Sequence, residues 1–199
     1  MFQLSDPGQR TLLGIARESV HSYLQGAALT LPEIDSGELA ELRALFVSIH
    51  SDEQLRGCVG NLYPTYPLFR STGDCAISAA VADPRFAPLA LPELPHVTFE
   101  ISVLSPMEQV RDISEIEIGE HGLLVAKGRS RGLLLPQVAT QYEWDRERFL
   151  EETCRKAGLN AQDWKDGATL SRFTAAVFSE NHVYDSEILN VGPTTSTHT

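Results

Sequence analysis

The sequence contains little cysteine: three residues in 199, widely separated at Cys58, Cys75 and Cys154. No C-x-x-C pair is present, so the spacing of a zinc site is absent and we predict no metal. An odd number of isolated cysteines is typical of a reducing compartment, where disulfides are rare. The cysteine pattern therefore predicts a cytoplasmic protein.

Basic residues are also scarce, since 16 Lys and Arg stand against 27 Asp and Glu and give a formal charge of −11. Such a surface repels a phosphate backbone unless a basic face is segregated on it, so nucleic-acid binding is disfavoured. No segment approaches about 18 continuous apolar residues, which predicts no membrane span. The N-terminal stretch MFQLSDPGQR lacks the basic and apolar regions of a signal peptide.

The motifs of the easily identified enzyme classes are missing as well. The sequence has no metalloprotease helix motif, P-loop, dinucleotide-binding G-x-G-x-x-G or G-x-S-x-G elbow. We therefore predict no cofactor. What is present is an ordinary globular composition, with 42% hydrophobic and 22% charged residues.

The hydrophobic pattern predicts helices and hairpins. We expect a helix from Asp6, as N-cap, to Gly26, a hairpin of strands 44–50 and 55–61, and a helix over 68–83. A Pro-rich connector precedes a strand over 96–105 that alternates apolar and polar residues, typical of an antiparallel sheet with one polar face.

A second hairpin within 121–135, a helix starting at Pro136, a helix capped by Asp145 and a strand over 169–180 complete the pattern. Because strands come in hairpins, we predict an α+β fold with a mainly antiparallel sheet flanked by helices. Residues 1–185 would form a single domain. The Ser/Thr-rich residues 186–199 are predicted to be a disordered tail.

The stretch QLRGCVGN places Arg56, Gly57, Cys58 and Gly60 within one predicted strand. A two-residue alternation would put Arg56, Cys58 and Gly60 on one face, where the arginine would favour the reactive thiolate and the glycines would leave room for a ligand. The alternative is a buried structural thiol, with glycines at a bulge and the arginine paired to an acid. The loop length leaves either Val47 or Ser48 opposite Cys58.

Two other groups of residues carry candidate chemistry. In Asp83-Pro84-Arg85, Arg85 either binds an anionic group of a ligand or pairs with Asp83 in a turn. His121, before Gly122, is either a general base or a turn residue. The basic turn 127–131 is either an anion site or a solvated hairpin tip.

Taken in order, the segments LRGCVG, DPRF, FEISVLSP, HGLLV, RGLLLPQVA, FLEETCRKAGL with Trp164, and FTAAVFSE resemble the AMMECR domain family, called AmmeMemoRadiSam system protein A in bacteria. The resemblance spans about residues 7–185. It implies a two-lobed α+β domain with a cleft, near which the Arg56–Gly60 motif, Asp83, Arg85 and His121 would lie. It also implies a genomic association with Memo-type and radical S-adenosylmethionine proteins.

Two hypotheses of function follow. In the first, the protein is an enzyme in which Cys58 is nucleophile or acid, Arg56 its electrostatic activator and His121 a base, while Gly57, Gly60, Asp83 and Arg85 hold the ligand. In the second, the protein is a non-catalytic module that binds a ligand, a Memo-type protein or a radical S-adenosylmethionine protein.

Overall fold

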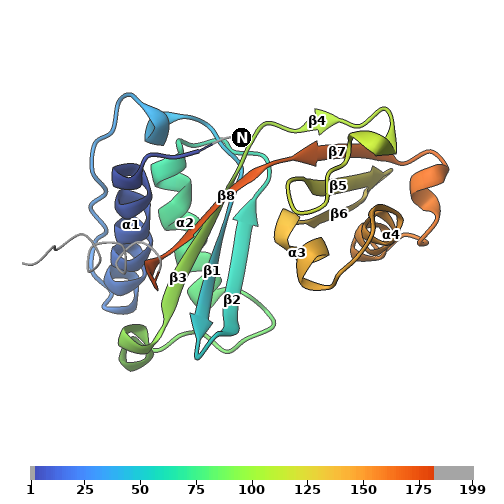
Figure 1. The fold of residues 1–199 in the computed structure, drawn as a ribbon. Coiled ribbons are helices and arrows are strands. Elements are labelled where there is room, and N and C mark those ends of the chain that lie inside the picture. The colour runs from blue at the N-terminus through green and yellow to red at the C-terminus, as the bar shows by residue number, and fades with distance from the viewer. Residues whose placement is uncertain (1–2, 182–199) are drawn as a thin grey trace, which may run out of the picture. The chain divides into compact units, whose positions relative to one another are not determined.

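The structure is a computed structural model that describes residues 3–181 (Figure 1). The chain divides into two compact units. The larger unit contains Leu4–Val103 and resumes at Val177, and the smaller unit contains Leu104–Ala176. The tail predicted at residues 186–199 lies outside the described residues.

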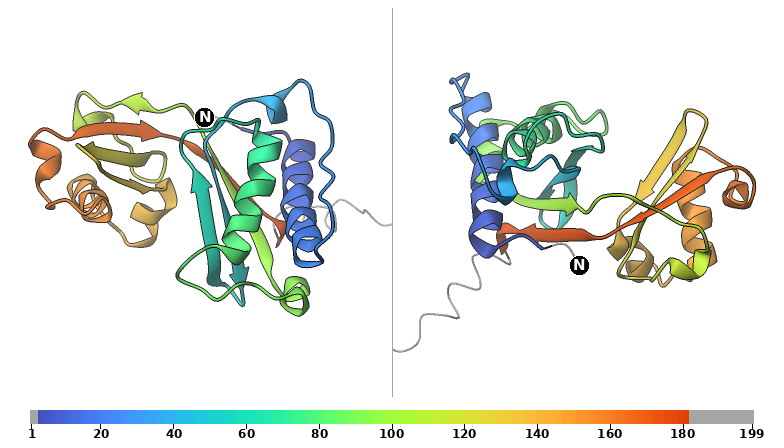
Figure 2. Two further views of the ribbon diagram at one scale, coloured as in Figure 1. Left: turned by 180° about the vertical axis from the view of Figure 1, so that it is seen from behind. Right: turned by 90° about the horizontal axis from the view of Figure 1, so that it is seen from above.

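The larger unit is a four-stranded sheet with two long helices on one side. Its strand order is β2-β1-β3-β8, and Figures 1 and 2 show α1 and α2 on the same side of this sheet. The elements are α1 (Asp6–Leu24), η1 (Glu38–Ala40), β1 (Leu45–Ser51), β2 (Gln54–Asn61), α2 (Leu68–Val81), η2 (Leu91–His96), β3 (Thr98–Leu104) and β8 (Ala175–Ser179).

Alternation along β1 and β3 gives this sheet one apolar and one polar face. The apolar side chains are at most 1% exposed and form the core with α1 and α2: Leu45, Val47, Ile49, Phe99, Ile101 and Val103. On the opposite side lie Phe46, Ser48, His50, Cys58 and Glu100, all partly exposed. We call these five residues the polar face. The alternation predicted over 96–105 therefore holds from Thr98 to Ile101, whereas Ser102 and Leu104, predicted on the other side, are also buried, at 3% and 1% exposed.

The β1–β2 hairpin has a tighter turn than the sequence indicates. Its loop is the two residues Asp52 and Glu53, both with positive φ, rather than the four residues 51–54. A β-bulge then places Ile49 opposite Gly57 and His50 opposite Leu55, so Arg56 is the extra residue. As a consequence Ser48, and not Val47, pairs with Cys58.

The smaller unit is a second antiparallel sheet with order β4-β7-β5-β6. Helix α4 packs against β5 and β6 over a core that includes Phe149, Leu150 and Cys154. Asp145 caps α4, as predicted, by accepting from the Arg148 amide at 2.8 Å. The elements are β4 (Glu108–Gln109), η3 (Ile113–Glu115), β5 (Gly122–Lys127), β6 (Ser130–Leu134), α3 (Pro136–Gln141), α4 (Arg146–Lys156), η4 (Asp163–Lys165) and β7 (Thr169–Phe173).

The prediction of a single strand over 169–180 is wrong. It is two strands, β7 and β8, that belong to different sheets. Between them, the Thr174 amide donates to the Ser105 hydroxyl at 3.0 Å, and the Ser105 amide donates to the Thr174 carbonyl at 2.9 Å. These hydrogen bonds satisfy the backbone where the chain leaves one sheet for the other.

The first helix begins one residue earlier than predicted. Ser5, not Asp6, is its N-cap, because the Ser5 hydroxyl accepts from the Gly8 amide at 3.2 Å. Gly26 follows the helix with φ of 67°, as expected of a helix stop. Among the described residues, none of the helices is long and apolar enough to cross a membrane.

The predicted α+β class, with antiparallel sheets flanked by helices, is confirmed. The cleft that the resemblance implies stays a prediction.

Candidate functional site

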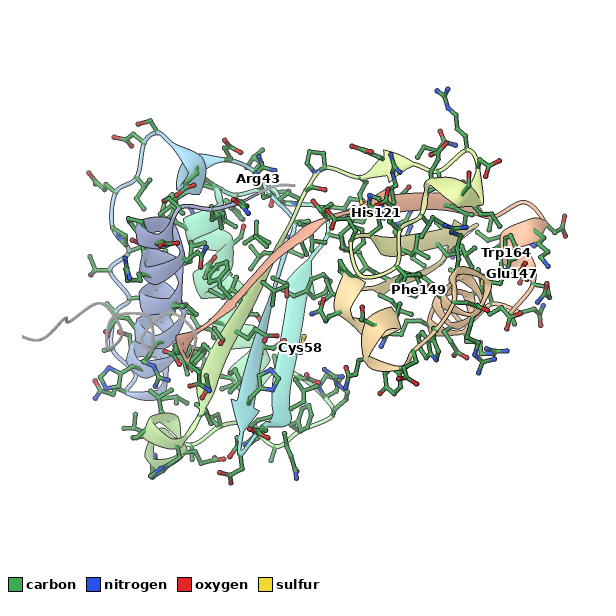
Figure 3. The ribbon with its side chains drawn as sticks, in the orientation of Figure 1. Arg43, Cys58, His121, Glu147, Phe149 and Trp164 are labelled. Atoms are coloured by element: carbon green, nitrogen blue, oxygen red, sulfur yellow. The ribbon has the colours of Figure 1, made fainter. Side chains whose placement is uncertain are left out.

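Cys58 lies in the middle of β2, the edge strand of the larger sheet (Figure 3). Its side chain is half-buried on the polar face. Its sulfur accepts a hydrogen bond from the Ser48 hydroxyl across the strands, at 3.3 Å. This short approach is expected for a non-hydrogen-bonded antiparallel pair, in which opposite side chains lie closest together. Cys58 is therefore partly accessible and has a hydroxyl donor beside its sulfur.

The Asp83–Arg85 pair closes the free edge of β2 at Cys58. The Cys58 amide donates to Asp83 Oδ2 at 2.9 Å, and Arg85 Nη2 donates to the Cys58 carbonyl at 3.3 Å. Arg85 also contacts both carboxylate oxygens of Asp83, at 2.9 and 2.7 Å. The two side chains thus satisfy backbone groups that a neighbouring strand would otherwise bind.

The charges of this pair are strongly coupled. Hydrogen bonds from the Arg85 side chain hold the pKa of Asp83 well below its usual range, against its burial. The Asp83 carboxylate in turn raises the pKa of Arg85, and Cys58 adds a smaller contribution in the same direction. Asp83 is 3% exposed whereas Arg85 is 52% exposed. The guanidinium of Arg85 therefore lies near Cys58 and also reaches solvent.

Arg56 does not approach the sulfur of Cys58 in this way. Its guanidinium binds Glu93 at 3.2 and 3.3 Å and the carbonyl of Ala87 at 2.7 Å. A hydrogen bond from the Ala90 amide holds the pKa of Glu93 below its usual value, and the charge of Arg56 lowers it further. Because the bulge at Arg56 interrupts the alternation of β2, this arginine anchors the connector after α2. The arginine beside Cys58 is Arg85.

The two glycines of the motif have packing contacts on different sides of the strand. A Cβ atom on Gly57 would lie 2.1 Å from the carbonyl oxygen of Ala79 in α2. A Cβ atom on Gly60 would lie 2.2 Å from the ring of Phe46, its cross-strand partner on the polar face. Gly57 therefore faces the helix layer, and of the two only Gly60 lies beside the polar face.

The other two cysteines differ from Cys58 in exposure. Cys75 and Cys154 are 6% and 0% exposed. Burial raises the pKa of Cys75 to about 11, with smaller contributions from Asp74 and Cys58. Burial also raises the pKa of Cys154. Both are structural thiols.

His121 lies in the smaller unit, just before β5 (Figure 3). Its Nδ1 atom accepts a hydrogen bond from the Glu117 amide at 3.0 Å, which closes a turn. In the basic turn, Lys127 binds Asp163 at 2.8 Å. The contacts of His121 are therefore those of a turn residue. Those of Lys127 fit a hairpin tip, which was the alternative to an anion site.

The predicted site residues do not include His50 and Glu100 of the polar face, whereas Ser48 is one of the two predicted partners of Cys58. Ser48 pairs directly with Cys58 on one side and with Glu100 on the other. His50 lies two residues along β1, with Nε2 4.0 Å from Glu100 Oε1. Only the alternation of β1 and β3 could have indicated these residues, because the bulge hides their register with Cys58. Within residues 3–181, no group of three His, Cys, Asp or Glu side chains could hold a metal ion.

This chain is similar in sequence to proteins of several archaea over most of its length. A protein of Pyrococcus furiosus is 40% identical over 194 residues, which cover 92% of each chain. A protein of Methanothermobacter thermautotrophicus is 41% identical over 186 residues, covering 89% of this chain and 97% of that one.

The fold has a similar solved structure. The crystal structure of an uncharacterized protein from Pyrococcus horikoshii matches with a TM-score of 0.83 at 38% identity, covering 90% of this chain and 94% of that one. The sequence pattern of the AMMECR1 family matches residues 13–178, which include the whole Cys58 motif, Asp83, Arg85 and His121. The chain therefore belongs to the AMMECR1 family.

Proposed function

We propose that this protein is an enzyme that uses the thiol of Cys58 as a nucleophile on a small substrate with an anionic group. The observation that carries the proposal is the surroundings of Cys58: its side chain is half-buried, its sulfur accepts a hydrogen bond from Ser48, and its carbonyl accepts one from the guanidinium of Arg85. The other two cysteines are buried.

The groups around Cys58 suit the charged form of a thiol. A hydroxyl donor and a guanidinium both interact more favourably with a sulfur anion than with a neutral thiol, and the thiolate is the nucleophile. The backbone of Cys58 is held on its outer side by Asp83 and Arg85. A fixed backbone limits the positions of the sulfur and lowers the entropic cost of reaching a reactive geometry.

Arg85 supports an anionic substrate. Its Nε and Nη2 atoms bind Asp83 and the Cys58 carbonyl. In the described part of the chain the Nη1 atom has no hydrogen-bond partner, and the side chain is 52% exposed. A guanidinium with free N–H groups binds carboxylates and phosphates well. A substrate anion at Nη1 would therefore lie near the sulfur.

The test is site-resolved alkylation of the native protein with iodoacetamide, measured by peptide mass spectrometry between pH 6 and 9. We expect Cys58 to be modified while Cys75 and Cys154 are protected, and all three to react after denaturation in urea. Arg85→Gln should slow the reaction at Cys58 at pH 7. A native Cys58 that is inert up to pH 9 overturns the proposal.

The thiol role is then tested on an acyl donor. Incubation with a reactive ester should give an acyl adduct on Cys58, detected by intact mass, and Cys58→Ser should lose the thioester-linked adduct. Because an adduct on a reactive thiol can form without a catalytic cycle, turnover of the ester must exceed that of the Cys58→Ala variant. Equal turnover with folding intact would leave only a binding role.

A binding module is the second candidate, and exposed aromatic residues favour it. Tyr63 and Tyr66, which follow β2, are 60% and 46% exposed, and Leu42, which precedes β1, is 60% exposed. Exposed tyrosines are enriched at protein interfaces. We propose Memo-type and radical S-adenosylmethionine proteins as partners. In a pull-down with the purified partners, this role predicts that Tyr63→Ser with Tyr66→Ser abolishes binding while Cys58→Ala retains it.

A further inference from the structure

A row of polar side chains crosses the larger sheet at Cys58. The register places Cys58 of β2, Ser48 of β1 and Glu100 of β3 side by side. His50 lies two residues from Ser48 on the same strand, so its side chain points to the same face. A thiol, a hydroxyl, a carboxylate and an imidazole therefore gather on one surface of three adjacent strands.

His50 lies close to Glu100 at one end of this row. Its Nε2 atom lies 4.0 Å from Glu100 Oε1, and the two side chains are 29% and 33% exposed. On the other side of β1, Cys58 is paired with Ser48, two residues from His50, while the bulge at Arg56 leaves Leu55 directly opposite His50. Diagonal neighbours on an antiparallel pair have Cβ atoms about 7–8 Å apart, within reach of ring-bearing side chains.

The Nε2 atom of His50 is buried, and it has no hydrogen-bond partner in the part of the chain that the structure describes. A buried ring nitrogen without a partner is uncommon and costs stability unless a further group binds it. Proton transfer with a neighbouring side chain would supply such a partner. His121, by contrast, already accepts a hydrogen bond from the Glu117 amide through Nδ1.

We propose that His50 is the base that takes the proton of Cys58, and that Glu100 positions its ring and balances its charge; this rests on the proposed thiol function. The S–H bond breaks, its electron pair stays on sulfur, and an N–H bond forms on the imidazole. The result is a thiolate next to Ser48 and Arg85 and an imidazolium next to Glu100. The negative thiolate thus has the positive Arg85 nearby, and the positive imidazolium has the negative Glu100 nearby.

Within the described residues, the charged or titratable side chains on the two strands beside His50 are Glu100, Cys58 and Arg56, and the guanidinium of Arg56 is paired with Glu93. Glu100 lies beside His50 on β3. Cys58 lies on β2, where its carbonyl binds Arg85. Its direct partners Thr98 and Leu55 are uncharged, as are the residues of β8. Asp52 and Glu53 in the turn are exposed to solvent. A pH dependence of thiol reactivity that changes with His50 therefore reports mainly on the Cys58–His50–Glu100 set.

The experiment measures the alkylation rate of Cys58 by iodoacetamide from pH 5.5 to 9 in the full chain. We expect His50→Gln to lower the rate at pH 7 by about tenfold, since the paired imidazolium that favours the thiolate is lost. Glu100→Gln should lower it by less. The matched control is His96→Gln, at an exposed position, which should leave the whole pH profile unchanged. Near-ultraviolet circular dichroism verifies folding.

Added imidazole gives a second readout that a structural role would not change. It should restore part of the rate in His50→Gln and have no effect on the wild type. If His50→Gln does not fold, His50→Asn and Glu100→Gln carry the same test. An unchanged rate and pH profile with a reactive Cys58 would overturn the role of His50 alone, whereas an inert wild-type Cys58 would overturn the thiol function itself.

Discussion

At Gly57, strand β2 comes so close to helix α2 that no side chain fits. A methyl group there would lie 2.1 Å from the Ala79 carbonyl oxygen, and backbone atoms cannot move aside as a flexible side chain can. This close approach determines how deeply α2 packs on the sheet near Cys58. The packing of β2 against α2 near Cys58 therefore requires glycine at position 57.

We predict that Gly57→Ala destabilises the protein by at least about 1–3 kcal/mol, the usual cost of overpacking. Gly14→Ala is the matched control, because Gly14 is in an exposed position of α1 and nothing lies within 4 Å of its added Cβ atom. The control should stabilise by about 0.5–1 kcal/mol through helix propensity. Urea unfolding measures both, and equal stabilities of the two variants would contradict the account of Gly57.

The Asp83–Arg85 pair gives a pH-dependent prediction. Because Arg85 lowers the folded-state pKa of Asp83 below its unfolded value of about 3.9, the pair stabilises above that pH and is lost as the pH falls below it. Asp83→Asn should cost about 1–2 kcal/mol at pH 7, since half-exposed Arg85 is partly screened. The cost should shrink at pH 3. Urea midpoints at both pH values test this, and a cost independent of pH would refute it.

At the scale of elements, the β1–β2 hairpin decides which residue faces Cys58. Its two-residue turn needs positive φ at both positions, with 48° at Asp52 and 64° at Glu53. Such turns favour asparagine and glycine because other residues are strained in this conformation. The turn and the bulge at Arg56 together set the register that brings Ser48 to Cys58.

We predict that Glu53→Gly stabilises the hairpin by about 1 kcal/mol through relief of backbone strain. Ser51→Gly is the control, since Ser51 ends a regular strand and gains only chain entropy in the unfolded state; it should destabilise by about 0.5–1 kcal/mol. The shift of the thermal midpoint measures both. A drop in the midpoint of Glu53→Gly would show that the turn is not strained.

At the scale of the whole molecule, the larger unit is made from two distant parts of the chain. Arg17 in α1 binds both carboxylate oxygens of Glu180 at 2.6 Å and the carbonyls of Leu94 and Val97. The Phe99 amide also donates to Glu180 at 2.9 Å. Glu180 therefore links the end of β8 to the first helix and to the start of β3.

We predict that Glu180→Ala costs about 1–3 kcal/mol, because it leaves the buried Phe99 amide and the Arg17 guanidinium without this acceptor. Glu33→Ala, at an exposed position, should change stability by less than about 0.5 kcal/mol. Equilibrium unfolding in urea compares the two. A loss in Glu180→Ala no larger than in the control would mean that the link contributes nothing.

Local sequence signals were sufficient for most elements. The α4 helix from its Asp145 cap, the inward-facing Phe149, Leu150 and Cys154, and the buried side of β3 all follow from periodicity and capping. These features depend on residues a few positions apart, and the physics of caps and amphipathic faces is local. The family resemblance likewise rested on short motifs in order, and it is confirmed.

The contacts around Cys58 depend on residues far apart in the chain, and only the tertiary structure decided them. A one-residue bulge at Arg56 changes the partner of Cys58 from Val47 to Ser48, and no local signal fixes such a register. In the folded chain Arg56 pairs with Glu93, and Arg85 is the arginine that contacts Cys58. The sequence by itself determined the class of fold and the reactive residue types; strand register determined which of them meet.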